Sequence, residues 1–151
     1  MLFSGKSEAS KLRIASGLSL AGFLPFAACA LWLVIGNETQ PQWHQAFDVM
    51  RAYGIAILSF LGGIRWGAAL DSEKAGRVFL HSVCPALIAW ATIFMNPVFA
   101  LSILAMAFAA QGAWDVIAAQ NGNLPFWFGP IRMKLTFMVV ASLLIALFAV
   151  G

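Results

Sequence analysis

Five long apolar segments follow one another along this chain and leave little sequence for anything else. A helix needs roughly 20 apolar residues to cross about 30 Å of hydrocarbon. Hydrophobic residues make up 62% of the 151 positions and charged residues only 10%, against about a quarter in ordinary soluble domains. A water-soluble fold could not cover such a surface. The sequence therefore predicts an all-α membrane bundle, one domain over residues 1–151, with five transmembrane helices at about 14–35, 52–70, 78–95, 98–118 and 133–150.

The first apolar segment also has features of a secretory signal. Three basic residues, Lys6, Lys11 and Arg13, precede the apolar run, as they do in cleavable signal peptides. The run continues to Ile35, which is the length of a full span rather than of a short signal core. We therefore expect the first helix to be retained, with a kink near Pro25 because proline removes a backbone hydrogen bond.

Lysine and arginine residues near the ends of the segments predict the orientation of the bundle. In short loops these residues gather on the cytoplasmic side of a membrane. Threading the chain through five spans puts Arg51 on the outer side and Arg65 within a span. The sequence thus predicts the N-terminus inside and the C-terminus outside. The positive residues on the inner side are then Lys6, Lys11, Arg13, Lys74, Arg77, Arg132 and Lys134.

Small residues recur every four positions in the second segment. Ser59, Gly63 and Gly67 therefore share one stripe of a helix. Small side chains on such a stripe let the backbone of another helix approach closely. We interpret this stripe as a helix-packing surface.

Two charged residues fall inside predicted spans, where a charge costs roughly 2.5–3.5 kcal/mol at the helix centre. Arg65 and Asp115 come at similar depths from the inner side, and Gln111 lies one turn before Asp115 on the same face. His81 adds a third ionisable group from that side. These four residues predict a polar cluster, which is either a structural pairing of charges or a site for an anionic or carbonyl-bearing headgroup.

Tryptophan is abundant in this chain, with six residues. Tryptophan is enriched at membrane interfaces for ordinary amphipathic reasons, and interface anchoring is one interpretation. Trp66, Trp114 and Trp127 all fall toward the predicted inner side. The alternative is that these three line a pocket for an amphipathic ligand.

The residue types that catalysis needs do not form recognisable patterns here. There is no nucleophile with a matching base, no carboxylate pair, no metal-ligand spacing and no phosphate-binding loop. Cys29 and Cys84 lie within apolar segments and are interpreted as small buried residues. We therefore expect neither an enzyme nor a resident cofactor or metal. The scattered positive charges, net +3, do not predict nucleic-acid binding.

Three parts of the sequence resemble one known membrane family. They are Tyr53 to Gly67, Gly22 to Phe26, and the stretch from Leu124 to Thr136 that contains Leu124-Pro125-Phe126-Trp127-Phe128. Together they resemble the bacterial and mitochondrial family known as domain of unknown function 3429. The resemblance implies a multi-pass protein of the bacterial inner membrane, or of the mitochondrial inner membrane in a eukaryote. It implies no reaction and carries over no catalytic residue.

The sequence leaves several kinds of function to compare. Small size, little extramembrane mass and the stripe of small residues favour an accessory or assembly subunit of a larger membrane complex. Such a subunit would contact the lipid bilayer and either a membrane-protein partner or a second copy of itself. The alternative is a binder of a small amphipathic ligand, such as a lipid, quinone or tetrapyrrole, in a Trp-lined pocket. A transporter or channel fits less well, because five short helices leave little room for a polar pathway.

Overall fold

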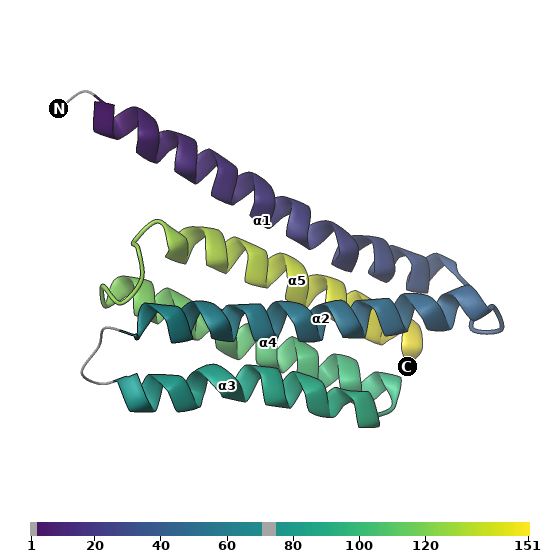
Figure 1. Ribbon diagram of the computed structural model, residues 1–151. Coiled ribbons are helices and arrows are strands. Elements are labelled where there is room, and N and C mark those ends of the chain that lie inside the picture. The colour runs from purple at the N-terminus through teal and green to yellow at the C-terminus, as the bar shows by residue number, and fades with distance from the viewer. Residues whose placement is uncertain (1–2, 71–74) are drawn as a thin grey trace.

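A computed structural model describes residues 3–70 and 75–151, and these residues form a bundle of long helices (Figure 1). No strand occurs in the described ranges, which confirms the predicted all-α fold. Five helices are long and apolar enough to cross a membrane, and each corresponds to one predicted span. The elements are α1 (Phe3–Ile35), α2 (Pro41–Ala68), α3 (Ala75–Ala91), the 3₁₀ turn η1 (Thr92–Phe94), α4 (Pro97–Gln120) and α5 (Phe128–Val150).

Two prolines and one capping asparagine mark the starts of α2 and α4. Pro41 and Pro97 stand in the first turns of α2 and α4, where a missing backbone N–H leaves no hydrogen bond unmade. The side chain of Asn96 accepts a hydrogen bond from the backbone nitrogen of Phe99 at 3.1 Å. Pro25 lies within α1, as predicted. The fold therefore follows local signals at the helix starts.

The second helix begins well before the predicted span. Its first turns contain polar residues such as His44 and Asp48, so the span predicted from hydropathy did not include these turns. Their other face is apolar, and Trp43, Phe47 and Met50 are buried there. Trp43 also donates from Nε1 to the backbone oxygen of Leu33 at 3.1 Å, which joins α2 to α1. The first part of α2 is thus an amphipathic extension of the transmembrane helix.

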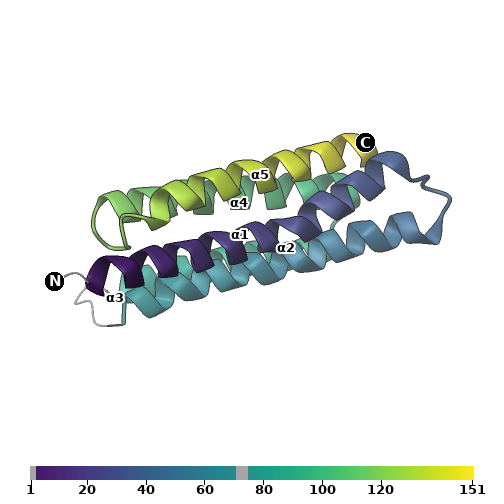
Figure 2. The ribbon, with the colours of Figure 1, turned by 90° about the horizontal axis from the view of Figure 1, so that it is seen from above.

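Helix α4 lies at the centre of the bundle. It packs against α2, α3 and α5, while α1 packs against α2 and α5. Figure 2 shows α1 running between α5 and α2. The core contains large side chains from α1, α2, α4 and α5, including Phe26, Leu58, Leu104, Phe108 and Leu143, each almost fully buried.

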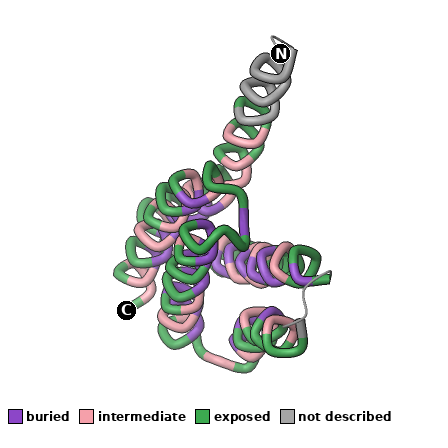
Figure 3. Tube along the Cα trace, turned by 90° about the vertical axis from the view of Figure 1, so that its left-hand side faces the viewer, coloured by how far each residue is buried: buried purple, intermediate pink, exposed green. Residues whose placement is uncertain are grey.

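Helix α1 approaches the other helices closely along only part of its length (Figures 1 and 3). In its second half Phe26 and Leu33 are 1% and 2% exposed. Earlier in the helix Leu18 and Leu20 are 69% and 54% exposed. The Tyr53 hydroxyl of α2 donates to the backbone oxygen of Gly22 at 2.8 Å and lies near the change between these two parts. The earlier part of α1 therefore diverges from the bundle.

Close helix contacts occur at glycines other than the predicted ones. Ser59 is exposed, and a Cβ added to Gly63 or Gly67 would find no heavy atom within 4 Å. The predicted stripe therefore does not pack on another helix within the part of the chain that the structure describes. At Gly62 a Cβ would overlap the backbone oxygen of Ser82 on α3. One residue corresponds to about 100° around a helix, so the stripe and the true contact lie on different faces.

Positive residues of α1, α3 and α5 lie near the same end of the bundle. The start of α1, the end of α2 and the α4–α5 connection lie at one end of the bundle (Figure 1). Arg13, Arg77 and Lys134 belong to the parts of α1, α3 and α5 near that end. This arrangement agrees with the orientation prediction, which assumes that successive helices cross the membrane in opposite directions. The side of the membrane that this end faces stays a prediction.

Candidate ligand site beside the buried Asp115 and Arg132

A buried ion pair joins α4 to α5. Arg132 Nε lies 2.9 Å from Asp115 Oδ2, and the two side chains are only 6% and 2% exposed. Gln111, one turn before Asp115 on α4, donates from Nε2 to Asp115 Oδ1 at 3.0 Å. Both carboxylate oxygens therefore have a partner. Pairing is what allows two charges to remain inside an apolar bundle.

The sequence prediction missed Arg132 as a member of this cluster. The fifth span was predicted to start at residue 133, so Arg132 counted as a loop charge. In the structure α5 begins at Phe128, and Arg132 is therefore one turn inside the helix. Close packing of α4 on α5 brings it to Asp115; at Gly112 a Cβ would overlap the Thr136 side chain. An earlier helix start at the Trp127-Phe128 turn was the signal that could have revealed it.

Arg65 lies near Asp115 but is not its bonded partner. Its guanidinium carbon lies 5.2 Å from the ring centroid of Trp114, which is the distance of a cation–π contact. Trp114 directly precedes Asp115 on α4, so Arg65 lies in the same region as that carboxylate. The predicted neighbours Arg65 and Asp115 thus lie in one region, but the ion pair with Asp115 is formed by Arg132.

His81 completes the predicted cluster from α3. Its ring centroid is 4.8 Å from that of Trp114, and its Nδ1 lies 2.6 Å from the backbone oxygen of Arg77. A recess of about 10 Å³, room for roughly one water molecule, lies beside these side chains. It is lined by Arg65, Val78, His81, Ser82, Gln111 and Trp114. Three of the four predicted cluster residues, Arg65, His81 and Gln111, therefore line one small recess.

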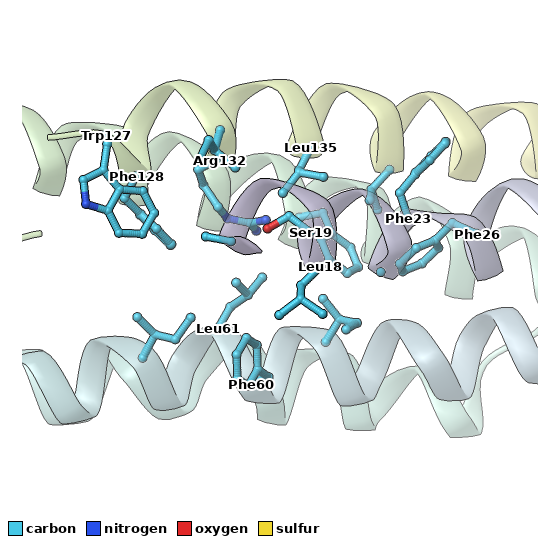
Figure 4. A pocket seen from close by; sticks show the side chains of 17 residues that line it. Leu18, Ser19, Phe23, Phe26, Phe60, Leu61, Trp127, Phe128, Arg132 and Leu135 are labelled. Carbon is cyan, nitrogen blue, oxygen red and sulfur yellow. The ribbon is translucent and has the colours of Figure 1, made fainter. Parts of the chain in front are cut away.

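A much larger cavity lies on the α5 side of the ion pair. It has a volume of about 410 Å³ and is lined by α1, α2 and α5, with Phe108 contributed by α4 (Figure 4). Its wall is almost entirely apolar, and Arg132 is the one ionisable side chain among the described residues that line it. The aromatic side chains of the wall are Phe23, Phe26, Phe60, Phe108, Trp127 and Phe128.

Arg132, which lines this cavity, has a side-chain donor without a partner among the described residues. Its Nη2 atom is buried and has no hydrogen-bond partner among the described residues. In Figure 4 the guanidinium group of Arg132 and the hydroxyl group of Ser19 on α1 point toward one another. A buried donor without a partner costs about 1–3 kcal/mol, so an acceptor placed between these groups would remove that cost.

The three tryptophans of the predicted pocket occupy different places. Trp127 lines the large cavity. Trp66 stacks on Phe79 of α3, with ring centroids 4.4 Å apart, and Trp114 lies between Arg65 and His81. They do not line one pocket, because Trp66 and Trp114 project from faces of α2 and α4 that point toward α3. The aromatic lining of the cavity consists mainly of phenylalanines.

Comparison with known families agrees with the resemblance. The model of the family described as "Protein of unknown function (DUF3429)" matches residues 12–148. The chain belongs to this family. Transmembrane protein 69 of Xenopus tropicalis is 33% identical over 132 residues, which is 83% of this chain and 50% of the frog protein. Transmembrane protein 69 of Mus musculus is 32% identical over 138 residues, 86% of this chain and 54% of the mouse protein.

Membership in the DUF3429 family supports a multi-pass membrane protein, since its relatives are named transmembrane proteins. The chain spans about half the length of these relatives. No solved structure matches the chain.

Proposed function

We propose that this protein binds a small amphipathic molecule of the bilayer in the cavity between α1, α2 and α5. One observation carries the proposal: a buried arginine with an unpartnered Nη2 lines a cavity that is otherwise apolar. Apolar walls with a few well-placed polar groups are typical of small-molecule sites. The proposed activity is binding rather than catalysis.

The size of the cavity supports this function. Sites for small molecules enclose roughly 300–1,000 Å³, and the cavity of about 410 Å³ falls in that range. Protein interiors are otherwise close-packed, with few voids larger than a water molecule. A space of this size next to lipid favours an occupant over a packing defect.

The position of α1 gives such a molecule a way in. The early part of α1 diverges from the bundle, and the cavity is bordered there by Ala15, Leu18 and Ser19. Leu18 is 69% exposed, so this border meets the surrounding lipid. Entry from the bilayer would need no passage through water.

A cavity-filling variant tests the proposal. Ala15 lines the cavity, whereas Ala21 is exposed on the same helix and does not. We expect Ala15→Phe to reduce binding of decylubiquinone and of monoolein, measured by native mass spectrometry of the purified protein, and Ala21→Phe to leave it unchanged. Absence of both adducts from the parent protein, or equal binding by the two variants, would overturn the proposal.

A second candidate function is an accessory or assembly subunit of a larger complex in the bacterial or mitochondrial inner membrane. The observation that favours it is the outer face of α2, where Ser59, Gly63 and Gly67 are exposed and leave open space beside the backbone. Small residues of this kind let another transmembrane helix approach closely. Cross-linking from a photoreactive residue at Gly63 in intact membranes tests it: a single discrete partner supports the role, and lipid adducts alone count against it.

A further inference from the structure

We infer that the molecule held in the cavity is a neutral, planar ring compound that carries a carbonyl oxygen, with that oxygen on Arg132 and its ring among the aromatic side chains. Quinones are the membrane-soluble class with these properties. The inference rests on the proposed binding function and adds to it the chemistry of the ligand. Three independent features of the cavity support it.

Hydrogen-bond chemistry determines that the polar end of the ligand is an acceptor. A guanidinium group has only donors, and the Nη2 of Arg132 has no acceptor among the described residues. Ser19, whose hydroxyl points toward that guanidinium in Figure 4, can donate to the same atom. A carbonyl oxygen with two lone pairs satisfies both donors at once.

Charge favours a neutral acceptor over an anion. The positive charge of Arg132 is already balanced by Asp115 at 2.9 Å, and among the described side chains that line the cavity no other is ionisable. A phosphate or carboxylate would therefore compete with Asp115 for one cation inside an apolar site, where an unpaired charge is costly. Arg65 cannot supply the missing charge, since it lies over Trp114 and lines the small recess instead.

Aromatic side chains favour a flat ring. Six of the residues that line the cavity are aromatic, and Trp127 and Phe128 lie near Arg132 while Phe23 and Phe26 lie farther along the cavity (Figure 4). Ring pairs are stabilised beyond the burial of their area, an advantage that an aliphatic chain lacks. The ring therefore belongs beside Arg132, and its apolar tail extends toward Phe26.

Three probe molecules distinguish the contribution of the ring from that of the carbonyl group. Decylubiquinone has both ring and carbonyl groups, decylbenzene has a ring without a carbonyl group, and monoolein has an ester carbonyl group without a ring. We expect decylubiquinone to bind at least about tenfold more tightly than either of the others in native mass spectrometry, a difference of roughly 1.4 kcal/mol. Equal binding of monoolein or decylbenzene would overturn the inference and leave the proposed binding function intact. Binding of none of the three would overturn both.

Infrared spectroscopy tests the anchoring bond on the unmodified protein. With decylubiquinone labelled with ¹³C at one carbonyl group at a time, a hydrogen bond to a guanidinium group should lower the stretching frequency of one carbonyl group on binding. Unchanged frequencies for both would contradict the assignment of Arg132.

A charge-neutral double variant completes the test. Asp115→Asn with Arg132→Gln removes both charges together, so neither is left without its partner. We expect this variant to bind decylubiquinone about tenfold more weakly and to bind decylbenzene as tightly as the parent protein does. An equal loss of binding for both probes would indicate a merely structural role for Arg132. If the double variant does not fold, the infrared result on the parent protein decides.

Discussion

Arg132 of α5 and Asp115 of α4 form a buried ion pair, 2.9 Å long, across a separation of 17 residues in the sequence. The pair lies between two spaces of different character. On one side is the recess beside Arg65 and His81, and on the other is the apolar cavity that Arg132 lines. The same contact therefore stabilises the packing of α4 on α5 and orients the donor group of the proposed ligand site.

Removing the carboxylate should destabilise the protein. Asp115→Asn leaves the charge of Arg132 buried without its partner, and we expect a loss of roughly 3 kcal/mol in the free energy of unfolding. Denaturation in mixed micelles measures it. Asp48→Asn is the matched control, because Asp48 pairs with Arg51 at 2.7 Å but its side chain is 61% exposed. A change below about 1 kcal/mol is expected there. Equal stabilities of the two variants would contradict the importance of the buried pair.

Arg65 should matter less than Asp115 for stability. Its main described contact is the Trp114 ring at 5.2 Å, which is worth about 0.5–2 kcal/mol. We therefore expect Arg65→Gln to lower the free energy of unfolding by less than Asp115→Asn does. The same denaturation experiment compares the two. A larger effect of Arg65→Gln would indicate that Arg65, rather than Arg132, is the counter-charge of Asp115 in the membrane.

Two adjacent glycines should respond differently to substitution. Gly62→Leu places a side chain against the backbone of Ser82, so α2 and α3 must separate, at a cost of about 1–3 kcal/mol. Gly63→Leu points into open space and should change the free energy of unfolding by much less. Thermal unfolding in detergent compares them directly. Greater destabilisation by Gly63→Leu would place the helix contact on the stripe predicted from the sequence.

The orientation of the bundle can be tested with single cysteines in a background without Cys29 and Cys84. A cysteine at Thr39, in the α1–α2 connection, should react with a membrane-impermeant maleimide added to intact cells. A cysteine at Asn121, in the α4–α5 connection, should react only after the membrane is opened. The reason is the predicted gathering of positive residues on the inner side. The reverse labelling pattern would invert the predicted topology.

The helical architecture could be predicted from the sequence because each span is a long apolar run, and hydrocarbon imposes both its length and its helical form. Helix boundaries were less predictable. Hydropathy assigned Arg132 to a loop, whereas the structure has it one turn inside α5. That difference of a few residues concealed the true partner of Asp115.

Rotation about the helix axis was the other property that the sequence did not determine. Gly62 and Gly63 are adjacent in a motif rich in small residues, and only tertiary packing selects Gly62 for the contact with α3. The large cavity was unpredictable for a related reason. It depends on the divergence of α1 from α5 and α2, which no local pattern encodes. Of the three predicted pocket tryptophans, Trp127 alone lines it.

An experimental structure of the protein crystallised in a lipid phase with decylubiquinone would show whether Arg132 holds a quinone in the cavity. We expect ring density between α1 and α5, with one carbonyl oxygen within about 3.2 Å of the Arg132 guanidinium group. A structure in which α1 closes onto α5 and Arg132 Nη2 bonds to the protein itself, with decylubiquinone absent from the space, would contradict it.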